Sequence, residues 1–229
     1  MTTLLLLAAL GPPFFLFRYI YRLDSVEKEP GSLLARLFIL GIISVIPAMF
    51  LETALTSWIE GTAWSMLSLQ ILDNFIGVAL VEEGCKYFFL KRATWKHEAF
   101  NYRFDAVVYA AVVSLGFAAA ENVLYTFEYG MSIALIRAVT SIPGHAIFGI
   151  YMGYYYGMAK YAAMRGEDGR SRSYRAAALL VPLLLHGFYD FMLSFNEGSM
   201  TLLFIGYLVI LDIFALRSLK RNAREDEPV

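Results

Sequence analysis

The stretch FDAVVYAAVVSLGFAAAENVLYTF, residues 104–127, decides the fold class of this chain. Asp105 and Glu121 are its only charged residues, and the rest is almost entirely apolar. A helix needs roughly 20 mostly apolar residues to cross the hydrocarbon core of a bilayer. The stretch therefore predicts a membrane-spanning helix, and the rest of the chain can be searched for others.

The composition agrees with a membrane protein. Hydrophobic residues make up 59% of the 229 residues and charged residues 17%, against about 45–50% and about 25% in soluble domains. One soluble core of this size could not bury so much apolar surface. The net charge of −1 gives no basic field for nucleic acid. The single cysteine, Cys85, excludes an intrachain disulfide and a thiolate zinc cluster.

The same length criterion predicts an all-α fold, a polytopic transmembrane helical bundle of about seven spans. We expect the spans at residues 2–21, 33–58, 66–90, 104–127, 132–159, 175–196 and 199–219. The connectors are short, so no domain outside the membrane can carry the function. The polar segments 166–173 and 224–229 are expected to be mobile.

The positions of the basic residues predict the orientation. Seventeen of the 19 Lys and Arg residues flank alternate connectors and the last span. The connectors around Glu60, Glu128 and Glu197 contain none. Because short cytoplasmic loops are enriched in Lys and Arg, we expect the N-terminus outside and the C-terminus in the cytoplasm.

The third span contains charged residues that are costly in a bilayer and are functional candidates for that reason. Glu82 and Lys86 stand four apart and share a helix face, whereas Glu83 lies about 100° around the axis. Two carboxylates and one ammonium leave the group one positive charge short, so a metal, a proton or a cation from another helix is needed. The alternative is a Glu–Lys pair that reaches towards the cytoplasmic surface.

The fourth span contains Glu121 and Asn122 directly after the small residues 118–120, which permit close helix approach. Asn122 serves equally well as a helix-packing hydrogen-bonding residue. Glu121 is an acid well inside an apolar run and is a candidate site residue.

Two of the three histidines, His145 and His186, also fall within predicted spans. Pro143 is expected to bend the helix just before His145. His186 precedes Asp190 by four residues, so the carboxylate can accept from one ring nitrogen and fix the tautomer. Two intramembrane histidines beside a glutamate pair favour chemistry over packing.

After His145 comes a stripe of small residues, Gly149, Gly153 and Gly157, which serves either internal packing or a homodimer face. Other buried charges receive a structural interpretation. Arg137 is expected to pair with Glu128 near the outer surface. The remaining acids that we assign to packing or helix ends are Glu52, Asp73, Asp105 and Asp212.

Carboxylates and imidazoles in a dry pocket suit activation of water. A glutamate can act as general base while a histidine orients the water or stabilises the oxyanion. The same groups could instead hold zinc, with Glu82, Glu83, His145 and His186 as the candidate ligands. Both arrangements hydrolyse a peptide or amide bond. An ion- or proton-coupled transporter is the competing interpretation, because it also needs buried acids and broken helices.

Four motifs follow one another along the chain. They are Glu82-Glu83-Gly-Cys-Lys86, then Phe117-Ala-Ala-Ala-Glu121-Asn122-x-x-Tyr125, then His145, and His186-Gly-Phe-Tyr-Asp190. In this order they resemble the motifs of the PrsW family of bacterial membrane proteases. The first predicted cytoplasmic loop, with Asp24 and Glu27-Lys-Glu-Pro30, is also similar. The family is in turn similar to the type II CAAX-prenyl endopeptidase and abortive-infection superfamily.

The resemblance implies an intramembrane endopeptidase in the bacterial cytoplasmic membrane that cleaves a single-pass protein such as an anti-sigma factor. It implies Glu82 and Glu83 as the principal catalytic pair and His186 as their partner. His145 and Glu121 support them. We also count Lys86, Asp190 and Asn122 among the candidate catalytic residues. The wider superfamily usually has histidine where this chain has Glu121, so a three-ligand metal site must use His145 or be replaced by a metal-free mechanism.

The resemblance also leaves a question of depth. Glu82 and Glu121 are expected in opposite halves of the membrane, up to about 15 Å apart by the rise of 1.5 Å per residue.

We expect residues 1–220 to form one transmembrane peptidase domain and 221–229 a short polar tail. Lipid and the substrate are the expected partners.

Overall fold

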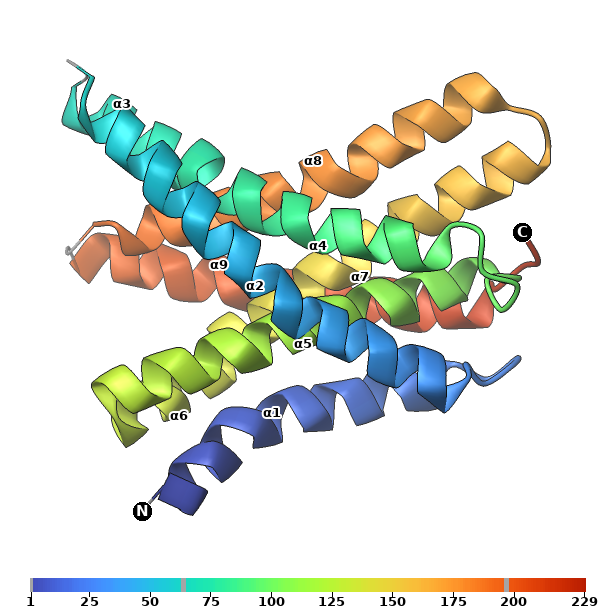
Figure 1. Ribbon diagram of the computed structural model, residues 1–229, viewed down its shortest axis with the longest axis horizontal. Helices are drawn as coiled ribbons and strands as arrows, with labels where there is room; N and C mark the ends of the chain where they lie inside the picture. The colour runs from blue at the N-terminus through green and yellow to red at the C-terminus, as the bar shows by residue number, and fades with distance from the viewer. Residues whose placement is uncertain (1, 63–64, 196–197) are drawn as a thin grey trace.

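The computed structural model describes residues 2–62, 65–195 and 198–229, which excludes Glu197 and its predicted connector. Within this part of the chain the secondary structure is helical, with one isolated bridge between Tyr102 and Pro228. The elements are α1 (Thr2–Leu23), α2 (Gly31–Glu60), α3 (Met66–Leu72), the π-helix η1 (Asp73–Ala79), α4 (Leu80–Thr94), α5 (Arg103–Tyr129), α6 (Met131–Val139), α7 (Ser141–Met164), α8 (Asp168–Leu193) and α9 (Gly198–Arg224). They form one bundle (Figure 1).

Among the described residues, six helical segments are long and apolar enough to cross a membrane, one fewer than the seven predicted spans, because the segment Met66–Thr94 is not one of them. They confirm the predicted all-α membrane bundle. The third predicted span corresponds to α3, η1 and α4, which follow one another without a break from Met66 to Thr94. Its π-helical middle part was not predicted. It ends at Ala79, just before the glutamate pair, and π-helical turns are frequent at functional sites.

The fifth predicted span is divided into α6 and α7. The break lies at Thr140, whose φ of −123° and ψ of −77° are not helical. The prediction of a bend at Pro143 is therefore wrong by three residues. Pro143 lies in the first turn of α7, where a missing backbone N–H costs nothing because that group has no intrahelical partner.

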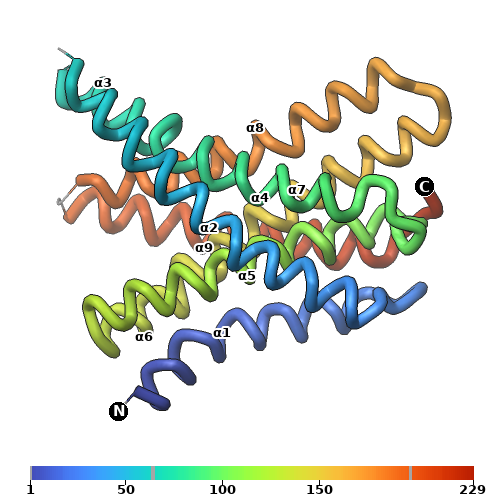
Figure 2. The backbone as a smooth tube through the Cα atoms, viewed as in Figure 1, coloured from blue at the N-terminus to red at the C-terminus, as the bar shows by residue number. Residues whose placement is uncertain are grey.

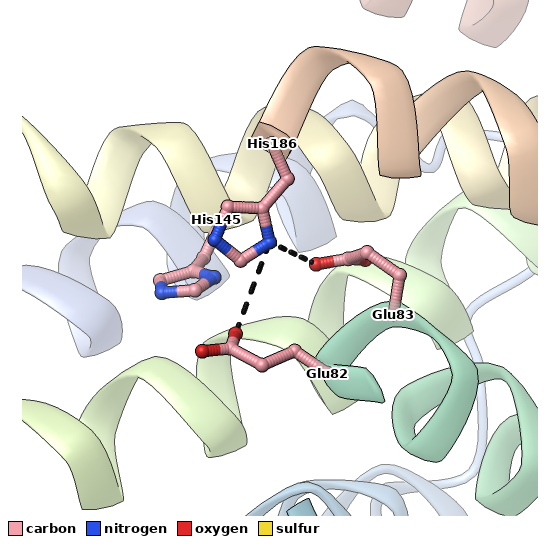
Figure 3. A group of neighbouring side chains, drawn as sticks. All are labelled: Glu82, Glu83, His145 and His186. Atoms are coloured by element: carbon pink, nitrogen blue, oxygen red, sulfur yellow. Dashed lines mark hydrogen bonds and ion pairs between the residues drawn. The ribbon is translucent and has the colours of Figure 1, made fainter. Parts of the chain in front are cut away.

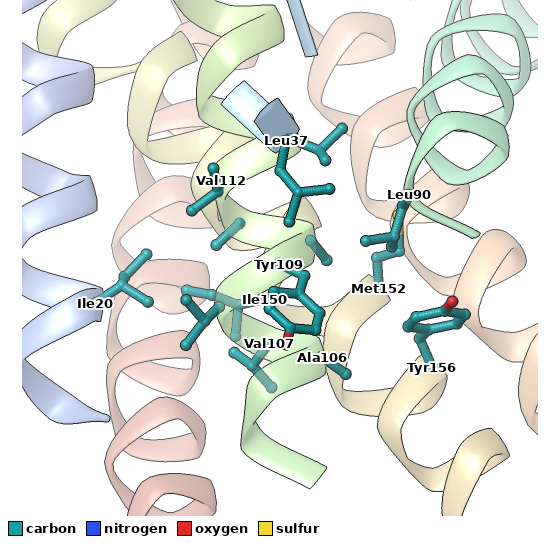
Figure 4. Close-up of a cluster of buried hydrophobic side chains, with 14 of the residues drawn as sticks. Ile20, Leu37, Leu90, Ala106, Val107, Tyr109, Val112, Ile150, Met152 and Tyr156 are labelled. Carbon is teal, nitrogen blue, oxygen red and sulfur yellow. The ribbon is translucent and has the colours of Figure 1, made fainter. Parts of the chain in front are cut away.

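Helix α5 is the centre of the bundle. Every residue from Phe104 to Ala119 is buried, and the side chains of the main hydrophobic cluster surround it (Figure 4). The glycine stripe of α7 packs against α5, since a Cβ atom on Gly149 would lie 2.9 Å from the Cα of Ala111. Gly153 and Gly157 likewise face the α5 backbone. The stripe is an internal packing surface, and it gives no support to a homodimer face.

The connectors divide between the two ends of the bundle. Residues 24–30, 95–102 and 165–167 and the C-terminus lie at one end, which we call the basic end (Figures 1 and 2). The N-terminus and the last residues of α2, α5 and α8 lie at the other, the non-basic end. The alternate connectors rich in Lys and Arg therefore share one end, as helices that run alternately in opposite directions require.

Two segments that we expected to be mobile are ordered. Most of 166–173 is helical, because α8 already begins at Asp168. The tail is bound to the start of α5: the Phe104 amide donates to Asp226 Oδ1 at 2.8 Å, and the Val229 amide donates to the Asn101 carbonyl at 2.9 Å. The first N–H groups of a helix have no acceptor within the helix, and Asp226 supplies one for the N–H of Phe104.

Candidate active site

The glutamate pair lies in the first turns of α4 and is buried, with Glu83 fully inaccessible and Glu82 5% exposed. Lys86 is also fully inaccessible, so it does not reach towards the membrane surface. Its Nζ donates to Glu82 Oε2 at 2.9 Å and to Glu83 Oε1 at 2.7 Å. The three groups form one buried ion cluster, which is costly unless every charge is compensated.

His145, from the first turns of α7, joins this cluster. Lys86 Nζ lies 3.2 Å from His145 Nδ1, and Glu121 Oε2 lies 2.9 Å from His145 Nε2. An ammonium group can only donate and an ionised carboxylate can only accept. The tautomer follows from these contacts: Nδ1 accepts from Lys86, and Nε2 carries the proton that it donates to Glu121.

His186, from α8, completes the group. Its Nδ1 lies 3.0 Å from Glu83 Oε1 and 3.9 Å from Glu82 Oε2 (Figure 3). Its Nε2 lies 3.1 Å from Asp190 Oδ2, so the four-residue spacing brings the two groups to ion-pair distance, without the alignment of a hydrogen bond. Both histidines therefore direct Nδ1 at the glutamate pair and Nε2 at a carboxylate behind them. Metal-binding histidines have the same arrangement, with a carboxylate on the outer nitrogen.

Glu121 joins the site through His145 rather than by touching the glutamates, so a difference in depth between Glu82 and Glu121 does not exclude it. Arg137 donates to Glu121 Oε2 at 2.7 Å and to Asn122 Oδ1 at 3.1 Å, so its predicted pairing with Glu128 is wrong.

Asn122 does not point at the glutamate pair. Its side chain is fully buried, and its Nδ2 donates to the Ala9 carbonyl of α1 at 2.9 Å. The sequence left a catalytic and a packing interpretation open for this residue. These contacts favour the packing interpretation.

A cavity of about 560 Å³ leads to the cluster, and we call it the site cavity. Its lining includes Glu82, Glu121, Arg137, His145, His186 and Asp190. A second cavity of about 290 Å³ lies between α2 and α5 and also reaches Glu82 and Glu121. Both are lined by residues from the halves of the helices nearer the non-basic end.

Glu52 of α2 lines both cavities, and sequence reasoning missed it. Within the described chain its buried Oε1 has no hydrogen-bond partner. Its packing interpretation rested on its position towards the outer half of its predicted span. Asp73, which received the same interpretation, does have a packing role: it accepts from Thr56 Oγ1 at 2.7 Å. The two acids look alike in the sequence, and they differ only in which groups the neighbouring helices place beside them.

The donor set fits a divalent metal ion. One ligand atom each from Glu82, Glu83, His145 and His186 lie within 4.8 Å of one another, and all four residues are buried. Glu83 Oε2 is a buried carboxylate oxygen without a partner among the described residues. Around the site four carboxylates face the cations of Lys86 and Arg137, so the group has an excess of negative charge. Oxygen and imidazole ligands of this kind suit zinc and similar ions.

The model of a family described as "PrsW family intramembrane metalloprotease" matches residues 29–216. The chain belongs to the PrsW family. PrsW proteins are membrane peptidases, and this chain is a multi-pass membrane hydrolase of that kind. The predicted family and enzyme class are confirmed.

Curated relatives agree over nearly the whole chain. "Protease PrsW" of Oceanobacillus iheyensis is 39% identical over 217 residues, which cover 95% of each chain. The protein of the same name from Geobacillus kaustophilus is 37% identical, covering 84% of this chain and 81% of the relative. That of Bacillus subtilis is 33% identical, covering 93% of each. No solved structure matches the chain.

Proposed function

We propose that this PrsW protein hydrolyses a peptide bond of a single-pass membrane protein of the anti-sigma-factor type, near the outer surface of a bacterial cytoplasmic membrane. The observation that carries the proposal is the buried glutamate–histidine cluster at the inner end of the site cavity. Peptide hydrolysis in a bilayer needs a water molecule and charged groups held away from lipid, and this cavity offers both polar walls and space.

The side of cleavage follows from two observations taken together. The cavities open among the helix halves at the non-basic end. Lys and Arg are enriched on the cytoplasmic side of membrane proteins, so the non-basic end is the outer one. The N-terminus is then outside and the C-terminus cytoplasmic. A substrate would be cut in the segment next to the outer end of its transmembrane helix.

The two glutamates receive different roles. Glu82 lines the site cavity, so it is the one that can take a proton from the attacking water. Glu83 lies behind it, in contact with His186 and Lys86. We assign Glu83, His145 and His186 as the ligands of a zinc ion, which leaves a fourth position open. A bound zinc ion would supply Lewis-acid polarisation of the peptide carbonyl and of water.

The remaining residues orient the ligands. Glu121 and Asp190 hold the Nε2 sides of His145 and His186, which leaves each Nδ1 directed at the glutamates. Arg137 holds Glu121 from the other side. Once Glu82 has the proton from water, it is placed to deliver it to the leaving amine at the same cavity wall.

The cavity between α2 and α5 offers a route from the lipid. It is lined by Met49, Thr53, Leu124 and Tyr125, and it ends at Glu82. Leu124 and Met49 are exposed on the lipid-facing surface. An extended substrate segment could pass between these helices while its transmembrane helix stays in the bilayer.

The test is cleavage of a single-pass reporter by purified protein in liposomes, with substitutions at the two positions most firmly assigned. Glu82→Gln and His186→Ala should each abolish cleavage while the protein stays folded. Metal content and activity with and without a chelator are measured on the same preparation. Normal cleavage by both variants would exclude this site, and full activity in a metal-free preparation would exclude zinc catalysis. Ion flux in empty liposomes would instead support the transporter.

A further inference from the structure

The feature that the peptidase mechanism leaves unexplained is the position of Lys86. Its Nζ lies 2.7 Å from Glu83 Oε1, 2.9 Å from Glu82 Oε2 and 3.2 Å from His145 Nδ1. These are three of the four groups that could hold a metal ion. A lysine that merely supported a metal site from outside would contact the far sides of the ligands.

The decisive contact is the one with His145. A neutral imidazole has a single lone pair on its unprotonated nitrogen, and in this tautomer that nitrogen is Nδ1. The lone pair can accept a hydrogen bond from Lys86 or bind a metal ion, but it cannot do both. The proton on Nε2 cannot move out of the way, because Glu121 Oε2 accepts it at 2.9 Å.

We propose that the Lys86 ammonium and a divalent metal ion are alternative occupants of this site. The inference rests on the proposed function in that it takes the metal to be bound by His145. In the metal-free protein Lys86 is the counter-ion of Glu82 and Glu83. When the metal binds, the N–H···Nδ1 hydrogen bond between Lys86 and His145 is replaced by a metal–nitrogen bond, and Lys86 keeps its own three protons.

The Phe117 ring stabilises the Lys86 ammonium independently of His145. Nζ lies 4.0 Å from the centre of the Phe117 ring, on its face, and such a contact stabilises a cation in a buried site. The charge of Lys86 therefore keeps a buried partner when its hydrogen bond to His145 is given up.

The consequence is a competition that can be measured without substrate. Lys86→Met keeps a side chain of similar length and a favourable sulfur–aromatic contact with Phe117, but it removes the competing charge. Lys91→Met is the matched control, because Lys91 lies on the same helix and is exposed. Zinc affinity is measured by competition with a chromophoric chelator, and thermal unfolding is measured with zinc and with excess chelator.

We expect Lys86→Met to bind zinc at least about tenfold more tightly than the wild type, because a buried positive charge beside the ion is removed. Its unfolding temperature should fall further in chelator than that of the wild type, and zinc should restore it. Lys91→Met should match the wild type in both measurements. Equal or weaker zinc binding by a folded Lys86→Met would overturn the inference.

If Lys86→Met does not fold even with zinc, the wild-type protein decides. X-ray absorption at the zinc edge counts its imidazole ligands. Two imidazoles require that His145 has left Lys86, whereas one imidazole, or no zinc uptake, refutes the competition. Cleavage of the reporter is scored separately, so the competition can fail while the protein remains a peptidase.

Discussion

The contact between Glu121 and His145 makes a quantitative prediction about catalysis. Glu121 Oε2 accepts from His145 Nε2 at 2.9 Å and from Arg137 at 2.7 Å. Glu121→Gln keeps the shape of the side chain but removes its charge. Both contacts then lose their charge-assisted character, and the amide can present its NH₂ group to His145 instead. The Nδ1 lone pair of His145 would no longer be held towards the glutamate pair.

The magnitude follows from the kind of contact that is lost. Removing the partner behind a metal-binding histidine typically reduces metal affinity or activity by about 10- to 100-fold, which corresponds to about 1.4–2.8 kcal/mol. Glu121 acts through His145, so it is a positioning residue. We therefore expect kcat to fall within that range, zinc affinity to fall in parallel, and KM to change little.

The assay compares Glu121→Gln with Asp212→Asn in liposomes that contain a single-pass reporter. Asp212 is also a carboxylate in a predicted span, but it lies on α9 and does not line the site cavity. Its substitution should leave kcat and zinc affinity unchanged. If Glu121→Gln retained full kcat and full zinc affinity while folded, the assignment of Glu121 as the residue that orients His145 would be refuted.

Three other outcomes test separate parts of the structure. Burial and the nearby Asp226 raise the pKa of Asp24 to about 6, so the native state loses stability as pH rises from about 4 to about 6. The loss in the free energy of unfolding should be about 1 kcal/mol after screening. Thermal unfolding of Asp24→Asn measured across this pH range should not show that loss. Deleting residues 226–229 should lower the free energy of unfolding by about 2 kcal/mol, because two or three hydrogen bonds are lost. If denaturant titration shows the same free energy of unfolding without these residues, the tail does not stabilise the fold. Leu124→Trp should raise KM several-fold by narrowing the passage between α2 and α5, whereas Phe88→Trp, also lipid-exposed, should not.

The helical bundle was predictable because its signals are local and strong. A run of about 20 apolar residues fixes a span by length alone, and the basic residues mark the connectors that share one end. The break at Thr140 and the π-helical segment Asp73–Ala79 were not predictable in this way. Both depend on how neighbouring helices pack, and neither position has a residue that requires the deviation.

The residues that the structure brings together at the candidate site could be predicted from the sequence, but the contacts among them could be predicted only in part. Charge inside apolar runs identified Glu82, Glu83, His145 and His186, and the structure brings all four together. The spacing of His186 and Asp190 predicted their contact because both lie on one helix. Contacts between helices were missed, as with Arg137 and Glu121 or the exposure of Glu52 to the cavities, because one sequence carries no information about which faces meet.

The adjacent glutamates show why the sequence alone could not assign roles. They follow one another in the chain and have the same chemistry, so they read as an equivalent pair. The rotation of about 100° between neighbouring helical residues sends Glu82 to the wall of the site cavity and Glu83 to the buried side of α4, against His186. Lys86, one turn further on, can contact both because it lies four residues from one and three from the other. The Glu-Glu-x-x-Lys spacing therefore places one carboxylate at the wall of the site cavity, a second on the buried side of the helix, and an ammonium within reach of both.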